Sequence, residues 1–426
     1  MKLYLLTLLT FILVFSACTQ NESSHVANPA DYEQYLSPDQ NPNALAAKKE
    51  LEFWSKKFEA TPSQYPYQAK MAGAHSALFN ETGEIANLHA AYKLYQEINK
   101  KTNNTQPGYL RSLARNCISQ HKFREAHEAL KIAEERGDQL RSTQKMLFDV
   151  CLELGSAEEA KTYLDKISNK KDFDYNIRLA KWNDHEGDLD AAIVLMEKAL
   201  AESKEKNNNG LILWSATNLG DFYGHAGRIE DAYQQYLNAL KLDPNNAYAL
   251  KGISWIAFSN DKNTKEAKRI ITALQKRRPV PDYDLLLAEI ASFENEEQAE
   301  KEYLESFIAK TKDARYGDMY NTYLAEVYEN PDSIMAIAET EIKNRPTPQS
   351  YALLAWAYYK NKEYKKALEI IEDKVQDKTF EPAAQYKMAV IYKANDFKDR
   401  TQALKAELGG SSYELGPVMG RKISSL

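Results

Sequence analysis

Apolar residues recur along the chain with a helical period, and small residues recur at a longer one. The clearest unit runs from Leu213 to Asn246, with its apolar and small positions at Leu219, Gly220, Tyr223, Ala232, Tyr236 and Ala239 and with Pro244 after them. Alanines lie at gaps close to multiples of 34 residues: Ala126, Ala160, Ala192, Ala232, Ala267, Ala367 and, less cleanly, Ala299. Small side chains let two helices approach closely while large ones fill the space between them. Each unit is therefore predicted to be a helix, a turn and a second helix.

These spacings resemble the tetratricopeptide repeat, a 34-residue helical hairpin that buries its apolar face only by stacking on its neighbours. Further copies centre on Leu113-Ala114, Leu147-Phe148, Leu179-Ala180 and Leu354-Ala355, with weaker ones at Ile253, Leu287-Ala288, Leu324-Ala325, Met388-Ala389 and from Tyr67 to Ile98. The resemblance implies an all-α fold, a right-handed α-α superhelix of about nine hairpins. We expect it to occupy residues 44–408.

Turn and breaker residues agree with this division. Gly155, Gly187 and Gly227 stand where first helices must end, and glycine readily adopts the left-handed conformation that closes a helix. Proline cannot continue a helix, so Pro244, Pro279 and Pro346 are predicted to follow second helices. The connectors 99–106, 201–210 and 308–315 are long for the family, and each is either a longer second helix or a loop that bends the superhelix.

The N-terminal residues have the pattern of a targeting signal. Lys2 is followed by an almost wholly apolar run from Leu3 to Phe15, too short to span a bilayer comfortably, and then by Ser16, Ala17 and Cys18. The run resembles a bacterial lipoprotein signal peptide over residues 1–17, which implies that Cys18 is lipidated. Residues 18–43 are polar and are expected to form a flexible tether. Because Thr19 rather than aspartate follows the cysteine, the resemblance implies anchoring at the outer membrane, on a face that the sequence does not specify.

The last residues, 409–426, contain several glycines and show no helical period. We expect a flexible C-terminal tail. The alternative is a cap in which Tyr413, Leu415, Val418 and Met419 pack over the final hairpin, because a solenoid end needs a cover.

Charge excludes some functions. The net charge is −6 and acids and bases are interspersed, which argues against nucleic acid as a partner. The dense basic run Lys276-Arg277-Arg278 lies at the end of a predicted helix, where cations complement the helix dipole.

Chemical motifs are not apparent. The seven histidines form no metal-binding spacing, and the chain has neither a nucleophile elbow nor a phosphate-binding loop. We therefore expect no enzymatic activity, no metal site and no cofactor. Cys117 and Cys151 occupy equivalent offsets in adjacent units, about one helix spacing apart, which is too far for a disulfide. They are predicted to be buried free thiols.

Binding residues follow from the resemblance, in which the first helices line a concave surface. The family's surface offsets fall on Arg111, Arg115, Lys145, Lys181, Trp214, Asp221, His225, Tyr248, Lys251, Trp255, Phe258, Trp356 and Tyr359. The first half of this surface is expected to be basic and the second aromatic, and exposed aromatic side chains often anchor peptides. For Trp255 and Trp356 the alternative is packing against neighbouring helices.

Two functions fit this pattern. The first is a membrane-anchored scaffold or adaptor lipoprotein that binds a protein or peptide at the bacterial cell envelope. The alternative is an outer-membrane lipoprotein that binds carbohydrate or another small ligand in an aromatic concave groove. The partner and the pathway are not encoded in any motif.

Overall fold

The computed structural model describes residues 25–38 and 40–426, and within these residues every regular element is a helix. The predicted signal peptide and the predicted lipidation at Cys18 lie outside the described residues. The first elements are α1 (Pro29–Leu36) and α2 (Pro42–Ala60), and the last is α23 (Ser412–Ser424). No helix in the described part of the chain is both long enough and apolar enough to cross a membrane.

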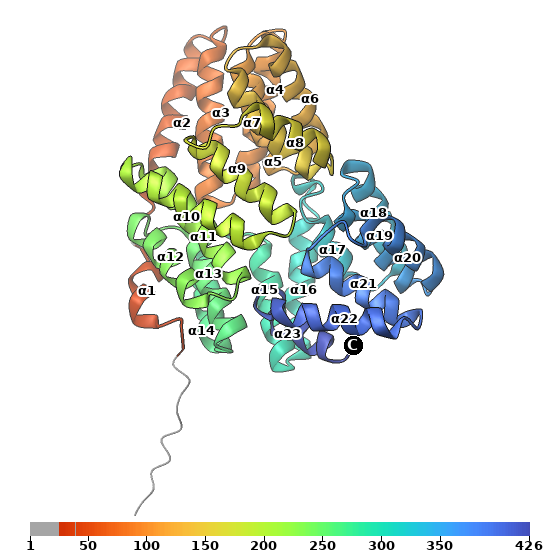
Figure 1. Cartoon of the computed structure of the whole chain (residues 1–426). Coiled ribbons are helices and arrows are strands. Elements are labelled where there is room, and N and C mark those ends of the chain that lie inside the picture. The colour runs from red at the N-terminus through yellow and green to blue at the C-terminus, as the bar shows by residue number, and fades with distance from the viewer. Residues whose placement is uncertain (1–24, 39) are drawn as a thin grey trace, which may run out of the picture.

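Ten helical hairpins fill the described chain between α2 and α23, where the sequence predicted about nine. They are α3 (Tyr65–Thr82) with α4 (Ile85–Lys101), α5 (Pro107–Ser119) with α6 (Phe123–Arg136), α7 (Leu140–Glu153) with α8 (Ala157–Lys166), α9 (Phe173–His185) with α10 (Leu189–Glu205), α11 (Asn209–His225) with α12 (Ile229–Leu242), α13 (Ala247–Trp255) with α14 (Thr264–Arg277), α15 (Asp282–Glu294) with α16 (Glu297–Thr311), α17 (Asn321–Val327) with α18 (Pro331–Asn344), α19 (Pro348–Lys360) with α20 (Tyr364–Ile370), and α21 (Pro382–Ala394) with α22 (Lys398–Leu408). Four short segments complete the list: η1 (Ile256–Asn260), η2 (Ala314–Tyr316), η3 (Ile371–Val375) and η4 (Gly409–Ser411). Figure 1 shows the hairpins stacked in chain order, and the predicted all-α superhelix is confirmed.

The periodic alanines lie at the seams between helices. Six of them have no exposed surface: Ala126, Ala160, Ala192, Ala232, Ala267 and Ala367. Ala299, which matched the pattern less cleanly, is only half-buried. A larger side chain at a fully buried seam has no free volume to occupy, so the 34-residue period is a packing requirement.

The turns follow the predicted punctuation. Gly155, Gly187 and Gly227 have φ values of 73°, 83° and 71° and connect the helices of their hairpins. Second helices end at Leu242, Arg277 and Asn344, each within two residues of its proline. Two of the long connectors are mostly helix, because α10 and α16 continue into them, whereas the connector after α4 is a loop.

Residues 25–38 and 40–43 are folded, so the expectation of a flexible tether over residues 18–43 is wrong for its described part. Asp261 accepts hydrogen bonds from the backbone N–H groups of Val26 (3.1 Å) and Ala27 (2.9 Å). The side chain of Tyr32 is fully buried, and its hydroxyl donates to Glu266 at 2.7 Å. Helix α1 therefore packs on the second helices α12 and α14. The polar composition of this segment indicated disorder. The sequence did not reveal its partners because they lie more than 200 residues away.

The C-terminal segment is also ordered, so the expectation of a flexible tail is wrong. Residues 412–424 form helix α23, which is kinked where Gly416 has a φ of 78° and Pro417 follows. Leu415, Met419 and Leu426 pack on the apolar cluster of Ala389, Leu408 and Ile423. The segment caps the final hairpin, as the alternative proposed, but it also contacts α11, η1 and α15 near the middle of the chain.

Contacts between distant hairpins hold the winding closed. Turns in the first half meet loops in the second half: Gly155 lies against Pro346, Gly187 against Phe380 and Gly83 against Val280. Arg124 donates to the carbonyl of Lys343 at 2.7 Å. In Figure 1 the yellow helices α7–α9 accordingly face the blue helices of the last hairpins.

Candidate functional site

First helices of successive hairpins contact one another, as α5 contacts α7, α7 contacts α9, and α11 contacts α13. We call the surface that they form the inner face, and these helices, with the continuation η1, carry the predicted site residues. Their environments differ between the two halves of the chain. Helices α5, α7 and α9 carry the predicted basic residues, and α11, α13, η1 and α19 carry the predicted aromatic ones.

The basic half is largely neutralised by contacts within the protein. Arg111 is buried and donates to the carbonyl of Asp138 at 2.9 Å and to Thr143 at 3.2 Å. It therefore ties α5 to the start of α7 and is not available to a ligand. Arg115 is exposed one turn further along α5.

Lysines in the next two hairpins are paired in the same way. Lys145 lies 2.5 Å from the carboxylate of Asp174 and 3.2 Å from that of Asp172. Lys181 pairs with Glu153 at 3.0 Å. Each pair joins a first helix to the adjacent unit, so the cations stabilise the stacking of hairpins. The prediction of a free basic surface is wrong for Arg111, Lys145 and Lys181, because acidic partners that the spacing did not reveal lie one unit away.

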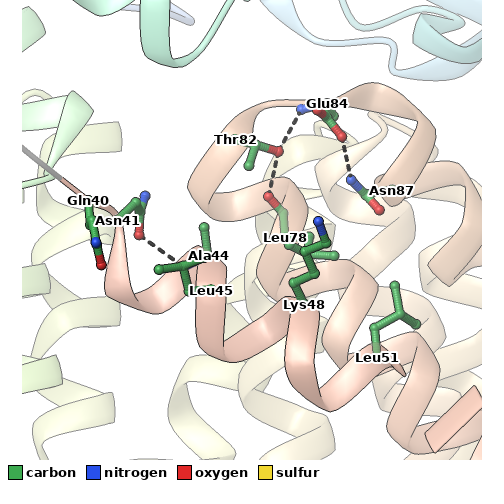
Figure 2. A pocket seen from close by; sticks show the side chains of 10 residues that line it. All are labelled: Gln40, Asn41, Ala44, Leu45, Lys48, Leu51, Leu78, Thr82, Glu84 and Asn87. Carbon is green, nitrogen blue, oxygen red and sulfur yellow. Dashed lines mark hydrogen bonds between the residues drawn. The ribbon is translucent and has the colours of Figure 1, made fainter. Parts of the chain in front are cut away.

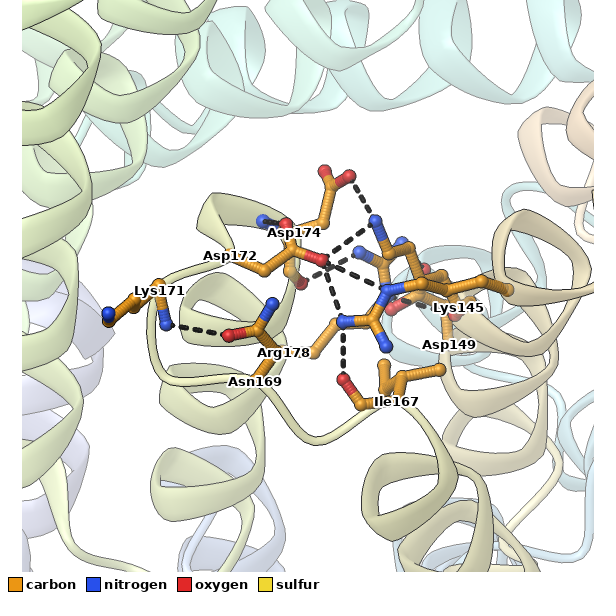
Figure 3. A network of polar contacts seen from close by, with 9 residues as sticks. Lys145, Asp149, Ile167, Asn169, Lys171, Asp172, Asp174 and Arg178 are labelled. Atoms are coloured by element: carbon orange, nitrogen blue, oxygen red, sulfur yellow. Dashed lines mark hydrogen bonds and ion pairs between the residues drawn. The ribbon is translucent and has the colours of Figure 1, made fainter.

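Figure 3 shows the centre of this polar network. Asp172 accepts from Arg141 at 2.7 Å, and Arg178 donates to Asp149 at 2.6 Å. Burial by itself would raise the pKa of Asp172, but the hydrogen bonds from Arg141 and Lys145 outweigh it and lower that pKa. The carboxylate therefore remains ionised and holds both cations.

The aromatic half keeps some side chains free. Trp214 and Tyr248 are 41% and 53% exposed, and Lys251 and His225 are exposed as well. Asp221 accepts from the hydroxyls of Tyr236 (2.6 Å) and Tyr248 (2.5 Å), which fixes the Tyr248 ring. Burial raises the pKa of Asp221, although both hydroxyl contacts oppose the shift.

Tyr248 and Lys251 line a cavity of about 530 Å³. Its walls come from the turn between α3 and α4, from the loops before α13 and α15, and from the segment around η2. The last two of these walls include Arg278, Asp282, Tyr316, Met319 and Tyr320. Aromatic, apolar and charged groups of both signs thus meet in one hollow, as is typical of ligand sites.

Phe258 does not belong to the site. It is fully buried and makes edge-to-face contacts with Trp255 and Phe293 at 5.8 and 5.7 Å. It lies in η1, a π-helical turn that continues α13. A π-turn adds a residue and rotates the positions after it, so the family offset no longer points outward there.

Trp255 is engaged by the C-terminal segment. Its indole N–H donates to the carbonyl of Tyr413 at 3.0 Å, and the hydroxyl of Ser259 donates to the same carbonyl at 2.7 Å. The Tyr413 ring lies so close to Gly224 that a Cβ added there would be 2.5 Å from it. Arg421 lies over the Phe293 ring at 4.2 Å. We call the pocket formed by Gly224, Tyr236, Trp255 and Ser259 the Tyr413 socket.

Trp356 and Tyr359 contact each other. Their rings stack with centroids 5.0 Å apart, and Trp356 also approaches Tyr386 at 6.4 Å. The side chains of Trp356 and Tyr359 are both half-buried. For Trp356, the alternative interpretation of packing against a neighbouring helix therefore applies, through its contact with Tyr386.

A second cavity of about 630 Å³ lies at the N-terminal end of the array, between α2 and the α3–α4 turn (Figure 2). Its apolar wall includes Ala44, Leu45, Leu51 and Leu78. None of the predicted site residues lines it.

Cys117 and Cys151 are buried and free, as predicted. Burial raises the pKa of Cys151 to about 12 and that of Cys117 further. Neither thiol is therefore a nucleophile at neutral pH.

Stacked hairpins whose first helices share an inner face define a helical-repeat scaffold. A tetratricopeptide repeat profile matches residues 215–246, which form most of α11 and α12. Residues 215–246 therefore form a tetratricopeptide repeat, one unit within the array of hairpins. A comparison with curated proteins finds no match.

Solved structures resemble the chain distantly. The human IFIT1 dimer with PPP-AAAA is 14% identical, with 72% of this chain and 71% of that chain covered and a TM-score of 0.48. A monomeric IFIT1 mutant with Gppp-AAAA is 13% identical, with 76% and 75% covered and a TM-score of 0.46. A tetratricopeptide repeat protein from Parabacteroides merdae is 17% identical, with 56% and 93% covered and a TM-score of 0.33. At these similarities, nothing about the ligands carries over to this chain.

Proposed function

We propose that this protein is a lipid-anchored scaffold or adaptor that binds a protein or peptide partner on its inner face at the bacterial cell envelope. The observation that carries the proposal is the Tyr413 socket. Two side chains of the inner face donate hydrogen bonds to one main-chain carbonyl, and a glycine leaves room for the attached aromatic ring. Main-chain hydrogen bonds combined with a pocket for a side chain are a common means of peptide recognition.

The exposed part of the same surface lies beside the socket. Asp221 and Tyr248 belong to the helices that flank it, and Tyr248 and Lys251 open into the 530 Å³ cavity. A partner peptide has an aromatic anchor, a cation and several carboxylates to contact there. The neutralised basic half offers few free cations to an acidic peptide, because Lys145 and Lys181 already have partners.

The glycan alternative has less support on this surface. It relied on Trp255 and Trp356 as exposed platforms, and both are engaged by other parts of the chain. Trp214 and Tyr248 are the exposed aromatic side chains that remain among the predicted site residues.

Photo-crosslinking from the inner face tests the proposal. A photoreactive amino acid replaces Trp214 or Tyr248 in the intact protein in its native membrane, and a matched control carries it at Lys301, which is exposed on the second helix α16. We expect a discrete protein adduct from the two inner-face positions and none from Lys301. The absence of a protein adduct, or adducts of equal yield at all three positions, would contradict the proposal.

Membrane attachment is tested separately by fractionation. Cys18→Ser should release the protein from the membrane fraction, because the acyl chains supply the attachment at about 0.8 kcal/mol per buried methylene. Cys117→Ser is the matched control and should remain in the pellet. If Cys18→Ser also stays there, the lipid anchor is wrong, while the crosslinking result still decides the question of the partner.

A further inference from the structure

Three side chains from three helices converge at the junction of the second and third hairpins. His127 comes from α6, Cys151 from α7 and Glu159 from α8. Their potential ligand atoms, an imidazole nitrogen, the thiol sulfur and a carboxylate oxygen, all lie within 4.8 Å of one another. Cys151 is buried, His127 is half-buried and Glu159 is exposed, so the group opens to solvent on one side. The sequence did not reveal this group because its members belong to no single local motif.

The donors are suited to a borderline-soft divalent cation. Zinc binds cysteine sulfur at about 2.3 Å and histidine nitrogen or carboxylate oxygen at about 2.0–2.2 Å, in a tetrahedral arrangement. Such bonds place neighbouring donor atoms about 3.4–3.8 Å apart. The Nε2 atom of His127 already lies 3.6 Å from the Glu159 carboxylate. Small side-chain rotations are therefore enough to bring all three donors to one ion.

The hydrogen bonding of His127 gives a second indication. Its Nε2 atom is shielded from solvent and makes no hydrogen bond in the described part of the chain, since the Glu159 carboxylate at 3.6 Å is just beyond hydrogen-bond distance. Buried polar atoms are nearly always paired, and an unpaired one requires an explanation. A metal ion would supply the missing partner.

The preceding hairpin provides an internal comparison. Cys117 and Glu125 lie 34 residues before Cys151 and Glu159, but Lys93 stands 34 residues before His127. In that hairpin the Glu125 carboxylate is already occupied, because the Tyr92 hydroxyl donates to it at 2.8 Å. The same cysteine and glutamate offsets therefore form a hydrogen-bonded arrangement in one unit and a three-donor cluster in the next.

We propose that His127, Cys151 and Glu159 bind a zinc-like divalent cation, with a water molecule in the fourth position. On binding, the Cys151 thiol releases its proton to solvent and the thiolate forms the metal–sulfur bond, while His127 binds through the neutral Nε2. The ion joins α6, α7 and α8 and so links two consecutive hairpins. The site is independent of the inner face and of the lipid anchor.

Cobalt is the probe for the test. The full-length protein is purified in detergent, stripped of metal and titrated with Co²⁺, whose bond to a thiolate produces a charge-transfer absorption in the near ultraviolet. We expect one equivalent of Co²⁺ to produce this band and Zn²⁺ to abolish it. Cys151→Ser should lack the band, and Cys117→Ser should keep it. No band at saturating Co²⁺, or a band that survives Cys151→Ser, overturns the proposal.

Two further variants guard against misfolding at the buried cysteine. His127→Gln and Glu159→Gln change side chains that are at least partly exposed, so the fold should tolerate both. Each should weaken Co²⁺ binding at least tenfold while the melting temperature without metal stays unchanged. Zn²⁺ should raise the melting temperature of the unmodified protein and of Cys117→Ser, but not that of either glutamine variant. Equal metal affinity in all these proteins would also overturn the proposal.

Discussion

The inner face is built in two ways along one chain. From α5 to α9 its cations are held by acids of the next hairpin, as in the pairs of Lys145 with Asp174 and Lys181 with Glu153. From α11 to α15 it is rich in aromatic side chains and receives the C-terminal helix α23. The same helical position thus serves adhesion between repeats in one region and recognition of a polypeptide segment in the other. A family offset identifies a residue's place in the repeat but does not show whether that residue is free.

The largest loss of stability is expected from Phe258→Ala. This substitution tests whether Phe258 belongs to the core or to the exposed surface of the aromatic region. Phe258 is fully buried between Trp255 and Phe293. Truncation should therefore leave a cavity and destabilise the protein by about 3–5 kcal/mol. Chemical denaturation measures the loss, with Val194→Ala as the control that should change stability little, because the Val194 side chain is 63% exposed. A small change in the free energy of unfolding for Phe258→Ala would mean that Phe258 is exposed, as the sequence predicted.

The next effect concerns the Tyr413 socket. Gly224→Ala places a Cβ 2.5 Å from the Tyr413 ring, so α23 must shift or detach. We expect a loss of about 1–3 kcal/mol, as for other overpacked sites, and faster hydrogen exchange over residues 412–424. Gly73→Ala is the matched control, because nothing lies within 4 Å of a Cβ there, and it should stabilise its helix by roughly 0.5–1 kcal/mol. Equal exchange rates over residues 412–424 in the two variants would show that the Tyr413 socket does not hold α23 in place.

Docking of α23 should also depend on pH. Burial raises the pKa of Glu289 from 4.5 to about 7; Lys422 opposes the shift and Glu326 adds to it. Glu289 lies against Gly416 of the docked segment. A carboxyl with a raised pKa in the docked state favours docking fully below pH 4.5, and this contribution is lost as the pH rises through 7.

Hydrogen exchange of residues 412–424 at pH 5 and pH 8, corrected for the intrinsic exchange rate, measures this dependence. We expect docking to weaken by about 1.4 kcal/mol at pH 8, the equivalent of one pKa unit, because Glu289 remains partly hydrated. Burial also raises the pKa of Glu414, with His225 opposing the shift and Asp184 adding to it, so this group acts in the same direction. Glu289→Gln should reduce the difference between the two pH values. If Glu289→Gln shows the same difference in exchange between pH 5 and pH 8 as the unmodified protein, Glu289 does not cause the pH dependence.

The smallest effect is expected in the polar region. Lys145→Ala removes a cation from Asp172 and Asp174, but Arg141 still pairs with Asp172. We expect a loss of about 0.5–1 kcal/mol, which shrinks in high salt because partly exposed ion pairs are screened. Lys301→Ala, at an exposed pair with Glu305, is the control and should change stability less. If Lys145→Ala lost several kcal/mol of stability, the polar network would contribute as much to stability as the buried core does.

The candidate site was only partly predictable. The exposed side chains of Trp214, Tyr248 and Lys251 lie on first helices as the resemblance implied. Arg111 and Phe258 do not fit the prediction, the first because its partners lie in the following loop and the second because a π-turn shifts the register. Short-range spacing carries no record of either effect.

By itself, the sequence determined the repeat, its turns and its breaks. These depend on local demands: a small residue such as Ala232 where two helices touch, a glycine such as Gly227 where the chain turns with positive φ, and proline after a second helix. Only the tertiary structure decided which inner-face residues are free, where the two termini dock and that His127, Cys151 and Glu159 meet. Those outcomes join residues that are distant in the sequence, such as Trp255 and Tyr413 at a separation of 158 positions. Such contacts form only when the winding of many hairpins brings their surfaces together, and no single repeat encodes that winding.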